Sequence, residues 1–259
     1  MKGRSWVLGV RCLRLPIIAE SIQGARLHPS LLRQAFEGSR RPLIVTSSAA
    51  ILDTGPVPVS ENGRLNPPPG FAWLPGFKQE ILKSSVRGIA IRPAWEVQGR
   101  RPQSSAIPVG WLRLARRFRR GIYIGSGESR YSAVHFDDLA DLYCIALKKA
   151  HAGTILHATS ENFTMNELAT ATHRGLGYKA EPSSLSRKEA RRFRPIADNL
   201  TLSHALSGDL ARTLGWKPSR NSIMKEIEHD AFVHAYSQGV DPPQTECQEQ
   251  SAACKMRTP

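Results

Sequence analysis

Two runs of strand-forming residues end in polar side chains that could bind a ligand. Residues 42–48 read PLIVTSS, an apolar and β-branched run that ends in hydroxyl groups. Residues 86–93 read VRGIAIRP, a second such run that ends in an arginine and a proline. Open α/β sheets bind ligands at the carboxyl ends of their buried parallel strands. The pattern therefore predicts a ligand site at one edge of an α/β sheet.

A third candidate cluster lies in residues 133–142, which read AVHFDDLADL. His135, Asp137 and Asp138 could be taken together for metal ligands. The interpretation that we favour makes Asp137 the cap of the helix that follows and His135 a packing or hydrogen-bonding residue. The four cysteines have no CxxC motif and no metal-ligand spacing, so the sequence does not support metal binding.

Positive charge is the unusual feature of the composition. The 259-residue chain has 36 Lys and Arg against 22 Asp and Glu, a net charge of +14, and an ordinary hydrophobic fraction of 41%. Residues 110–120 form an expected helix whose arginines lie off an apolar stripe. This helix could bind nucleic acid, present a solvated cationic face, or contact the phosphate of a nucleotide-linked substrate. No aromatic residues are interleaved on its charged side and no nucleic-acid motif is present, so nucleic acid is the disfavoured alternative.

The expected elements alternate strands with helices. Prolines block regular structure over residues 53–76, and two capping boxes, Thr164 to Glu167 and Ser186 to Glu189, predict helix starts. The other expected elements are helices at 29–36, 77–84, 110–120, from 137 onward and at 223–236, and strands at 42–48, 86–93 and 154–158.

In this order, the elements resemble the extended short-chain dehydrogenase/reductase superfamily, which includes NAD-dependent epimerases and dehydratases. PLIVTSSAAIL is similar to the family strand that ends in the catalytic serine or threonine, and VRGIAIRPAWEVQGR is similar to the family's RP-x-x-V-Y-G segment. GIYIGSGESRYSAVHFDDLADLYCIAL resembles the family's glycine-containing V-H-x-D-D-L-A region, and LGWKP is typical of the end of the substrate-side region. The resemblance runs from about Leu27 to Asp230 and implies a Rossmann-type parallel sheet.

The resemblance implies roles for residues at the ends of two strands. Ser48 matches the catalytic serine, which hydrogen-bonds a substrate carbonyl or hydroxyl oxygen. Thr46 and Ser47 would line the cofactor side, and Arg92 and Pro93 would lie near the nicotinamide of NAD or NADP. The alternatives are that the hydroxyls only end a strand and start a turn, and that Pro93 ends a strand while Arg92 pairs with a carboxylate.

The chain departs from the family pattern in two places. Residues 1–41 contain no G-x-x-G-x-x-G turn, whose backbone amides hold the dinucleotide diphosphate. None of the five tyrosines has a lysine four residues later, so the family's proton-donating Tyr-x-x-x-Lys pair is missing. Ala72 and Gly76 stand at those two positions, with Trp73 and Lys78 nearby. The resemblance therefore implies that the first βα units are absent and that catalysis is impaired.

The expected fold is a partial Rossmann-type α/β sheet with a smaller, mainly helical C-terminal region. The expected divisions are an unassigned segment at 1–26, an incomplete dinucleotide-binding region at 27–104, a substrate-side region interleaved with the sheet at 105–237, and a disordered tail at 238–259. No apolar run is long enough to span a bilayer, and the cysteine pattern suits a reducing compartment, so we expect a cytoplasmic protein without membrane contact.

The expected function is that of an NAD(P)-dependent oxidoreductase or epimerase acting on a small-molecule substrate, impaired by the two departures. Whether the chain is an active enzyme stays open on the sequence. One alternative is a non-catalytic remnant that binds a partner through surface the missing strands would have covered. Another is a basic binding protein that acts through its arginines. Family members are often dimers, so the resemblance also implies a possible homodimer.

Overall fold

The computed structural model describes residues 34–39, 41–55, 57–83, 85–99, 106–193, 199–220 and 222–229. The chain forms two compact units: unit 1 comprises Met1–Val97, Ser129–Phe163 and Leu202–Ser222, and unit 2 comprises Gln98–Glu128, Thr164–Thr201 and Ile223–Pro259. The segment expected at 1–26 and the tail expected at 238–259 lie outside the described residues. Each unit is built from three separate stretches of chain.

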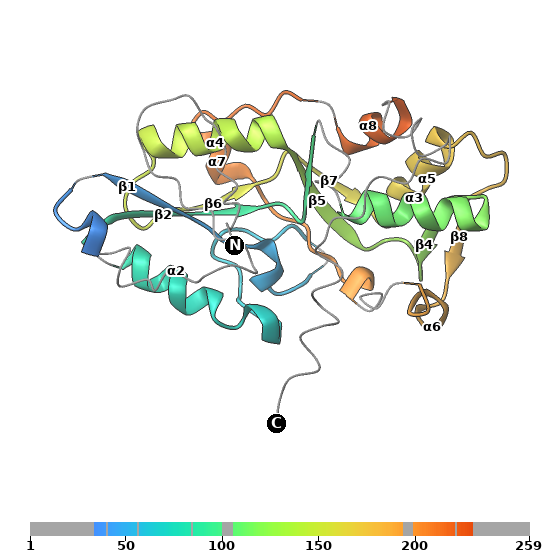
Figure 1. Ribbon diagram of the computed structural model, residues 1–259, viewed down its shortest axis with the longest axis horizontal. Coiled ribbons are helices and arrows are strands. Elements are labelled where there is room, and N and C mark those ends of the chain that lie inside the picture. The colour runs from blue at the N-terminus through green and yellow to red at the C-terminus, as the bar shows by residue number, and fades with distance from the viewer. Residues whose placement is uncertain are drawn as a thin grey trace, which may run out of the picture. The chain divides into compact units, whose positions relative to one another are not determined.

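A three-stranded parallel sheet lies at the centre of unit 1. Its strands are β1 (Pro42–Thr46), β2 (Arg87–Pro93) and β6 (Ile155–Ala158), in the order β1-β2-β6. Helix α4 (Phe136–Lys149) covers one face of this sheet and helix α2 (Leu74–Leu82) covers the other (Figure 1). A parallel sheet between helices is the α/β architecture that the sequence predicts.

Side chains of the three strands alternate between the two faces. The core on the α4 side contains the strand residues Ile44, Ile89, Ile91, Leu156 and Ala158 and the helix residues Leu139, Leu142, Tyr143, Ala146. The core on the α2 side contains Phe36, Leu43, Val45, Ile81 and Val86. Because both faces are buried, the strands read as continuous apolar runs in the sequence until their polar ends.

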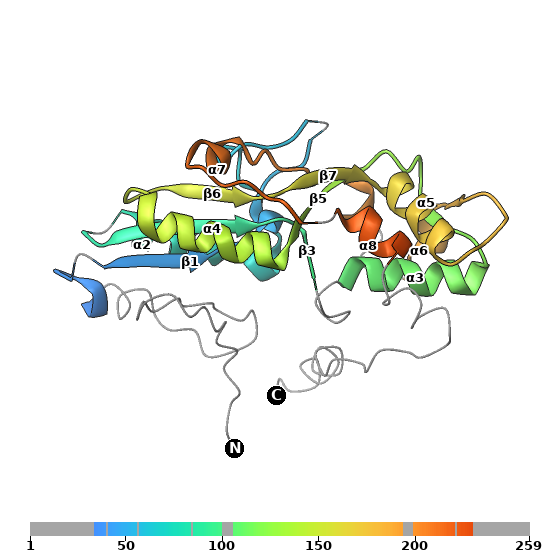
Figure 2. The same cartoon turned by 90° about the horizontal axis from the view of Figure 1, so that it is seen from above.

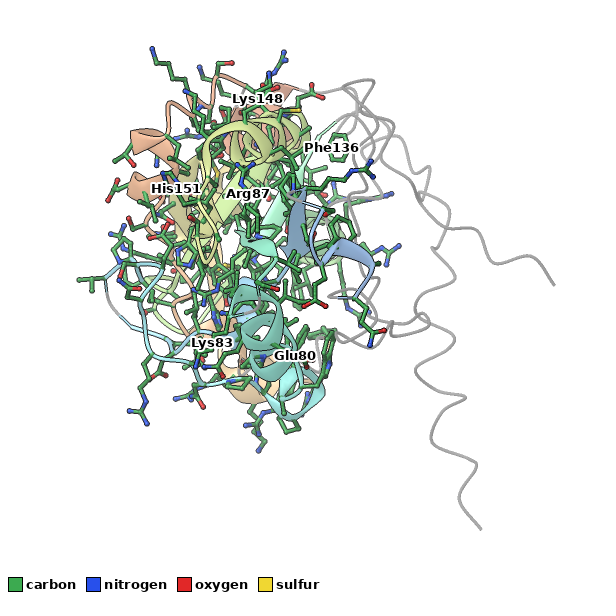
Figure 3. All side chains as sticks on the ribbon, turned by 90° about the vertical axis from the view of Figure 1, so that its left-hand side faces the viewer. Glu80, Lys83, Arg87, Phe136, Lys148 and His151 are labelled. Carbon is green, nitrogen blue, oxygen red and sulfur yellow. The ribbon has the colours of Figure 1, made fainter. Side chains whose placement is uncertain are left out.

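Helix α2 approaches β2 closely because residue 88 is a glycine. A Cβ atom at Gly88 would lie 2.6 Å from the carbonyl oxygen of Ile81 in α2. On the same strand, Arg87 donates from Nε and Nη2 to the carbonyl oxygen of Ala150, at 3.1 and 2.7 Å, just beyond the end of α4 (Figure 3). These contacts hold both helices against the amino-terminal part of β2.

A second three-stranded sheet has the order β3-β5-β7. Its strands are β3 (Glu96–Gln98), β5 (Arg130–His135) and β7 (Glu161–Thr164). Residues 53–76, expected as a loop, are largely irregular. Val59 in this stretch pairs with the chain near residue 206: its backbone N–H donates to the carbonyl oxygen of Ala205, and its carbonyl oxygen accepts from the backbone N–H of Ser207, both at 2.9 Å. The short helices η1 (Ala49–Ile51), η2 (Pro69–Phe71) and α7 (Asp209–Thr213) also belong to unit 1.

Helix α3 (Ala106–Phe118) and helix α5 (Met165–Gly175) of unit 2 lie against each other (Figure 2). Both helices contact β4 (Ile122–Ile124), which pairs in parallel with β8 (Ser183–Leu185) (Figure 1). The short helices α6 (Arg187–Ala190), η4 (Asn199–Thr201) and α8 (Ile223–His229) belong to the same unit. Both capping boxes predicted from the sequence are present, at Thr164 with Glu167 and at Ser186 with Glu189. Within the described ranges, no helix combines the length and the apolar character needed to cross a bilayer.

The start of α4 corrects one expectation. His135, and not Asp137, is the N-cap: its Nδ1 accepts from the backbone N–H of Asp137 at 3.1 Å. Asp137 lies in the first turn, where a carboxylate interacts favourably with the helix dipole. Asp138 is buried and accepts backbone hydrogen bonds from Ser219 and Arg220 at 3.0 and 3.1 Å. The aspartates therefore have structural partners at this helix start.

Candidate functional site

The polar ends of β1 and β2 lie side by side, as the two sequence runs predict. In the parallel register, Thr46 is opposite Ile91, and the backbone N–H of Ser47 donates to the carbonyl oxygen of Ile91 at 2.7 Å. Arg92 is in turn opposite His157 of β6. Ser47, Arg92 and His157 therefore form a row across the carboxyl ends of three neighbouring strands, the edge at which open α/β sheets bind ligands.

Thr46 belongs to the opposite face of the sheet from this row. Its Oγ1 is 2.6 Å from the hydroxyl oxygen of Tyr143, on α4, and either oxygen can be the donor. Burial raises the pKa of Tyr143 to about 12, so its phenol is neutral at physiological pH. Thr46 therefore fixes the end of β1 to α4, on the face of the sheet away from Ser47 and Arg92.

Ser48 caps the short helix that follows β1. Its Oγ accepts from the backbone N–H of Ala50 at 3.1 Å, and its φ and ψ of −138° and 143° are the extended values typical of an N-cap. The hydroxyl is used as an acceptor in this contact, so its proton stays available for donation to a ligand oxygen. The structural alternative from the sequence, a hydroxyl that starts a turn, and the expected role as a hydrogen-bond donor are thus compatible.

Arg92 is a buried cation with specific partners. It is 1% exposed, and its Nη1 donates to the carbonyl oxygen of Glu61 at 2.9 Å and to Nε2 of His157 at 3.0 Å. A guanidinium only donates, so Nε2 of His157 carries no proton, and Nδ1 donates to the carbonyl oxygen of Ser207 at 3.1 Å. Burial is the main cause that lowers the pKa of Arg92 to about 10, and burial followed by the charge of Arg92 lowers the pKa of His157 to about 4.

Glu61 brings a carboxylate to this cluster from the proline-rich loop. Its Oε1 accepts from the backbone N–H of His157 at 3.1 Å, and its charge acts to raise the pKa of Arg92 against the larger effect of burial. The sequence left open that Arg92 pairs with a carboxylate, and the structure places the carboxylate of Glu61 near Arg92 without a direct hydrogen bond between the two side chains. The guanidinium hydrogen-bonds the backbone carbonyl of Glu61, and the side-chain carboxylate bonds the adjacent strand.

Lys78 places a second cation on the buried face of α2. It is 4% exposed, and burial first, followed by the charge of Arg92, lowers its pKa from 10.5 to about 8. Its charge also contributes to the lowered pKa of His157. Lys78 therefore lies within electrostatic reach of the row formed by Arg92 and His157, with a proton that is held far less tightly than that of an exposed lysine.

The cluster has unused hydrogen-bonding capacity and excess positive charge. Lys78 and Arg92 carry two positive charges and Glu61 one negative charge, a net charge of +1 for the three side chains beside the neutral His157. Among the described residues, Nε of Arg92 and Oγ of Ser47 are buried without a hydrogen-bond partner. Buried donors without a partner cost free energy unless a ligand or water satisfies them. The arrangement suits an anionic or carbonyl-bearing ligand.

Pro93 ends β2 beside Ala158 of β6 in the parallel register. It is half-buried and has no polar side-chain atom, so it can only shape the wall of a site. The structure thus brings the five residues singled out in the sequence to two adjacent strand ends. It divides them between two faces, with Thr46 toward α4, and with Ser47 and Arg92 toward α2.

Three residues of the cluster were not among the sequence-based candidates. Lys78 was named only as a neighbour of Gly76, which is exposed, whereas Lys78 points inward. Its signal was available, because Lys78 follows Leu74 by four residues and precedes Ile81 by three, on the buried stripe of α2. His157 and Glu61 had no comparable signal.

The described residues fit one part of a dinucleotide better than the other. Unpartnered donors at Ser47 and Arg92 suit the polar groups of a nicotinamide or of a substrate. A diphosphate needs several backbone amides at a glycine-rich helix start, and residues 1–41, which precede β1, contain no such turn. Residues 1–41 therefore do not contain the glycine-rich turn that holds the diphosphate in dinucleotide-binding folds.

Comparison with known proteins places this geometry in a familiar fold. No family model matches the chain. An uncharacterized protein of Schizosaccharomyces pombe is 28% identical over 207 residues, which cover 77% of this chain and 68% of that protein.

Solved structures give the fold. UDP-glucose 4-epimerase from Thermotoga maritima, determined with UDP-glucose, superposes with a TM-score of 0.61 at 16% identity and covers 82% of this chain and 69% of its own. A dTDP-glucose 4,6-dehydratase from Bacillus anthracis, in complex with NAD, gives 0.60 at 12% identity, covering 82% and 67%. The human epimerase family protein SDR39U1, with NADPH, gives 0.58 at 21% identity, covering 78% and 71%. The chain therefore has the Rossmann-like α/β fold of these three solved structures.

Proposed function

We propose that this chain is an NAD(P)-dependent oxidoreductase- or epimerase-like protein of the extended short-chain dehydrogenase/reductase superfamily that acts on a small metabolite with impaired catalysis. One observation carries the proposal: Ser47 and Arg92 bring buried donors without a described partner to the carboxyl edge of a parallel sheet. Impairment follows from the missing phosphate-binding turn and from Ala72 and Gly76, which stand at the proton-donor positions and are both exposed.

Each residue of the cluster has a role that its contacts allow. Ser48 donates its hydroxyl proton to a substrate carbonyl or alcohol oxygen, because its cap uses the oxygen only as an acceptor. Arg92 and Ser47 satisfy their free donors on the ligand, and Lys78 adds positive potential and a weakly held proton to the site. NAD or NADP, when bound, would supply the hydride chemistry. Thr46 and Pro93 shape the ends of the two strands.

A non-catalytic role is the second candidate, and one observation favours it. Gly76 has no side chain to hold a nicotinamide ribose or to lower the pKa of a neighbouring phenol, and Ala72 has no proton to give. If this candidate is right, the fold persists as a scaffold that contacts a partner, and the purified chain gives no saturable response to any nicotinamide cofactor.

Cofactor titration of the full chain separates the two. We expect at least one of NAD+, NADH, NADP+ and NADPH to give a saturable change in intrinsic protein fluorescence and a rise in melting temperature, with a change in nucleotide fluorescence as well for the two reduced forms. Ser47→Ala should weaken that binding about 2- to 10-fold, the effect of one lost hydrogen bond, without lowering stability, because the hydroxyl has no described partner. Ser85→Ala, at an exposed position before β2, is the matched control. No response to any of the four nucleotides would refute the proposal and favour the non-catalytic candidate.

A further inference from the structure

Basic side chains gather on two segments of unit 2 that are far apart in the sequence. Five lie on and just after α3 and four on and just after α6, which makes nine in all. These residues, the α3–α6 basic surface, are Arg113, Arg116, Arg117, Arg119, Arg120, Arg187, Lys188, Arg191 and Arg192. Eight of the nine are exposed, and Arg116 is half-buried. The sequence pattern marked only the first segment.

Aromatic contacts join the two segments into one surface. The ring of Phe193, just after α6, meets the ring of Phe118 edge-on, with 5.5 Å between centroids. The guanidinium of Arg117 lies over the same Phe193 ring at 4.8 Å from its centroid. These contacts place the end of α3 beside the end of α6, so the two sets of cations act on the same region of solvent.

Acidic residues do not balance this surface from within its own segments. Residues 106–120 contain no Asp or Glu, and residues 186–193 contain one, Glu189. The carboxylate of Glu189 already accepts from the backbone N–H of Ser186 at 2.9 Å and from its hydroxyl at 2.6 Å in the capping box. Nine cations and one carboxylate leave a charge of +8 on the two segments. Such a density of like charge raises the local concentration of anions and is screened by salt.

We propose that the α3–α6 basic surface binds the phosphate backbone of a nucleic acid without reading its bases. Eight of its nine cations are arginines, whose planar guanidinium binds phosphate oxygens in a bidentate way. Arg113 and Arg117 of α3 are about 6 Å apart along the helix axis at about 1.5 Å per residue, and Arg119 and Arg120 follow the end of the helix. Duplex DNA carries one charge per about 1.7 Å of its axis, so a charge of this size and extent matches several phosphates.

Two observations argue against other anionic partners. The apolar residues Trp111, Leu112 and Ala115 of α3 are fully buried, so residues 111–118 offer no free apolar face to insert into a membrane. A nucleoside diphosphate carries two or three negative charges, far fewer than the +8 of the two segments. Phe193 is occupied by Phe118 and Arg117, which leaves no aromatic platform for base stacking. Contact through phosphates alone is what remains.

Salt-dependent binding tests the proposal on the full chain. We expect fluorescein-labelled duplex DNA of about 20 base pairs to bind with a log–log salt slope of about −3 or steeper, an affinity loss of about 60-fold between 50 and 200 mM salt. The triple variant Arg113→Gln, Arg120→Gln, Lys188→Gln should reduce the slope by about 3 at about 0.9 per phosphate, and weaken binding at least 10-fold. Circular dichroism and melting temperature check that the variant is folded.

A charge-matched control isolates the surface from net charge. Lys83→Gln, Lys148→Gln, Lys217→Gln removes the same three charges from exposed positions of unit 1, two of which are seen in Figure 3, and should leave binding unchanged. Equal weakening by both triple variants would show that only net charge matters and overturn the proposal. So would the absence of duplex binding, tighter binding to phosphatidylserine vesicles or polyglutamate than to DNA, or full displacement of the DNA by millimolar UDP-glucose.

Discussion

Replacing Lys78 by methionine should stabilise the protein. Lys78 is 4% exposed on the stripe that α2 buries, and its neighbours there, Leu74 and Ile81, are apolar. An unbranched thioether fills about the same space as the lysine stem and needs no hydrogen bond or counter-charge. Lys78→Met therefore removes the cost of holding an ammonium group beside Arg92 while it keeps the packing of α2 against β2.

The expected gain follows from the shifted pKa. The pKa of Lys78 falls from 10.5 in the unfolded chain to about 8 in the folded protein. Below pH 8 both states are protonated, and the folded state bears the full cost, about 3 kcal/mol at about 1.4 kcal/mol per pKa unit. Between pH 8 and 10.5 the unfolded state binds more protons than the folded state, so wild-type stability rises with pH. The advantage of Lys78→Met is therefore largest at pH 7 and disappears above pH 10.5.

Urea unfolding at several pH values, followed by circular dichroism, measures this difference. At pH 7 we expect a higher free energy of unfolding for Lys78→Met, by up to about 3 kcal/mol, and a melting temperature higher by about 6–12 °C. Lys83→Met, at the exposed end of the same helix (Figure 3), should change stability by less than about 0.5 kcal/mol. A stability difference that is absent at pH 7, or that does not shrink between pH 8 and 10, would refute the reasoning.

Other changes in the same structure have predictable effects. The pKa of His157 is 6.5 in the unfolded chain and about 4 in the folded protein, so between these pH values only the unfolded state gains a proton. The free energy of unfolding, measured with urea, should therefore fall by up to about 3 kcal/mol as the pH is lowered from 6.5 to 4. A free energy of unfolding that does not change over this range would contradict the assigned tautomer of His157. Gly88→Ala should lower the free energy of unfolding by about 1–3 kcal/mol, because the new Cβ would lie 2.6 Å from the carbonyl oxygen of Ile81. Gly76→Ala, at an exposed position of α2 with open space around it, should instead raise the free energy of unfolding by about 0.5–1 kcal/mol. Equal melting temperatures of the two variants would exclude the close contact at Gly88. Thr164→Ala removes the cap of α5 and should lower the free energy of unfolding by about 1 kcal/mol, whereas an unchanged value would mean that water replaces the cap.

The strands and their polar ends were predictable because they depend on local sequence. Residues buried on both faces of a parallel sheet must be apolar, so β1 and β2 stand out as uninterrupted runs, and the first polar residue marks the edge of the sheet. The capping boxes at Thr164 and Ser186 were equally visible, since their hydrogen bonds close within three residues. The N-cap of α4 was assigned to Asp137 because an aspartate is the commoner cap, whereas the ring nitrogen of His135 has that role.

The parts that the sequence did not predict depend on long-range contacts. Glu61 meets His157 across 96 residues, because Val59 pairs with the chain around residue 206 and brings the proline-rich loop back over the sheet. No local pattern contains that pairing. Alternation explains the second gap: Thr46 and Ser47 are neighbours in sequence, yet consecutive side chains of a strand point to opposite faces. The expectation that both residues line the cofactor side therefore missed that the hydroxyl of Thr46 bonds Tyr143, whereas the hydroxyl of Ser47 has no described hydrogen-bond partner.

Stability and ligand binding make opposite demands on the space under α2. A chain selected only for stability would place an apolar residue at position 78, since two buried cations with one nearby carboxylate cost free energy. Gly88 increases this cost, because it lets α2 lie close to β2 and so keeps the ammonium group of Lys78 near the positive charge of Arg92. A bound anion would offset both charges and accept a hydrogen bond from Nε of Arg92, so the free energy that burial of the two cations costs in the free protein would be recovered on binding. The buried pair Lys78 and Arg92 therefore favours the proposed ligand-binding function over the non-catalytic candidate.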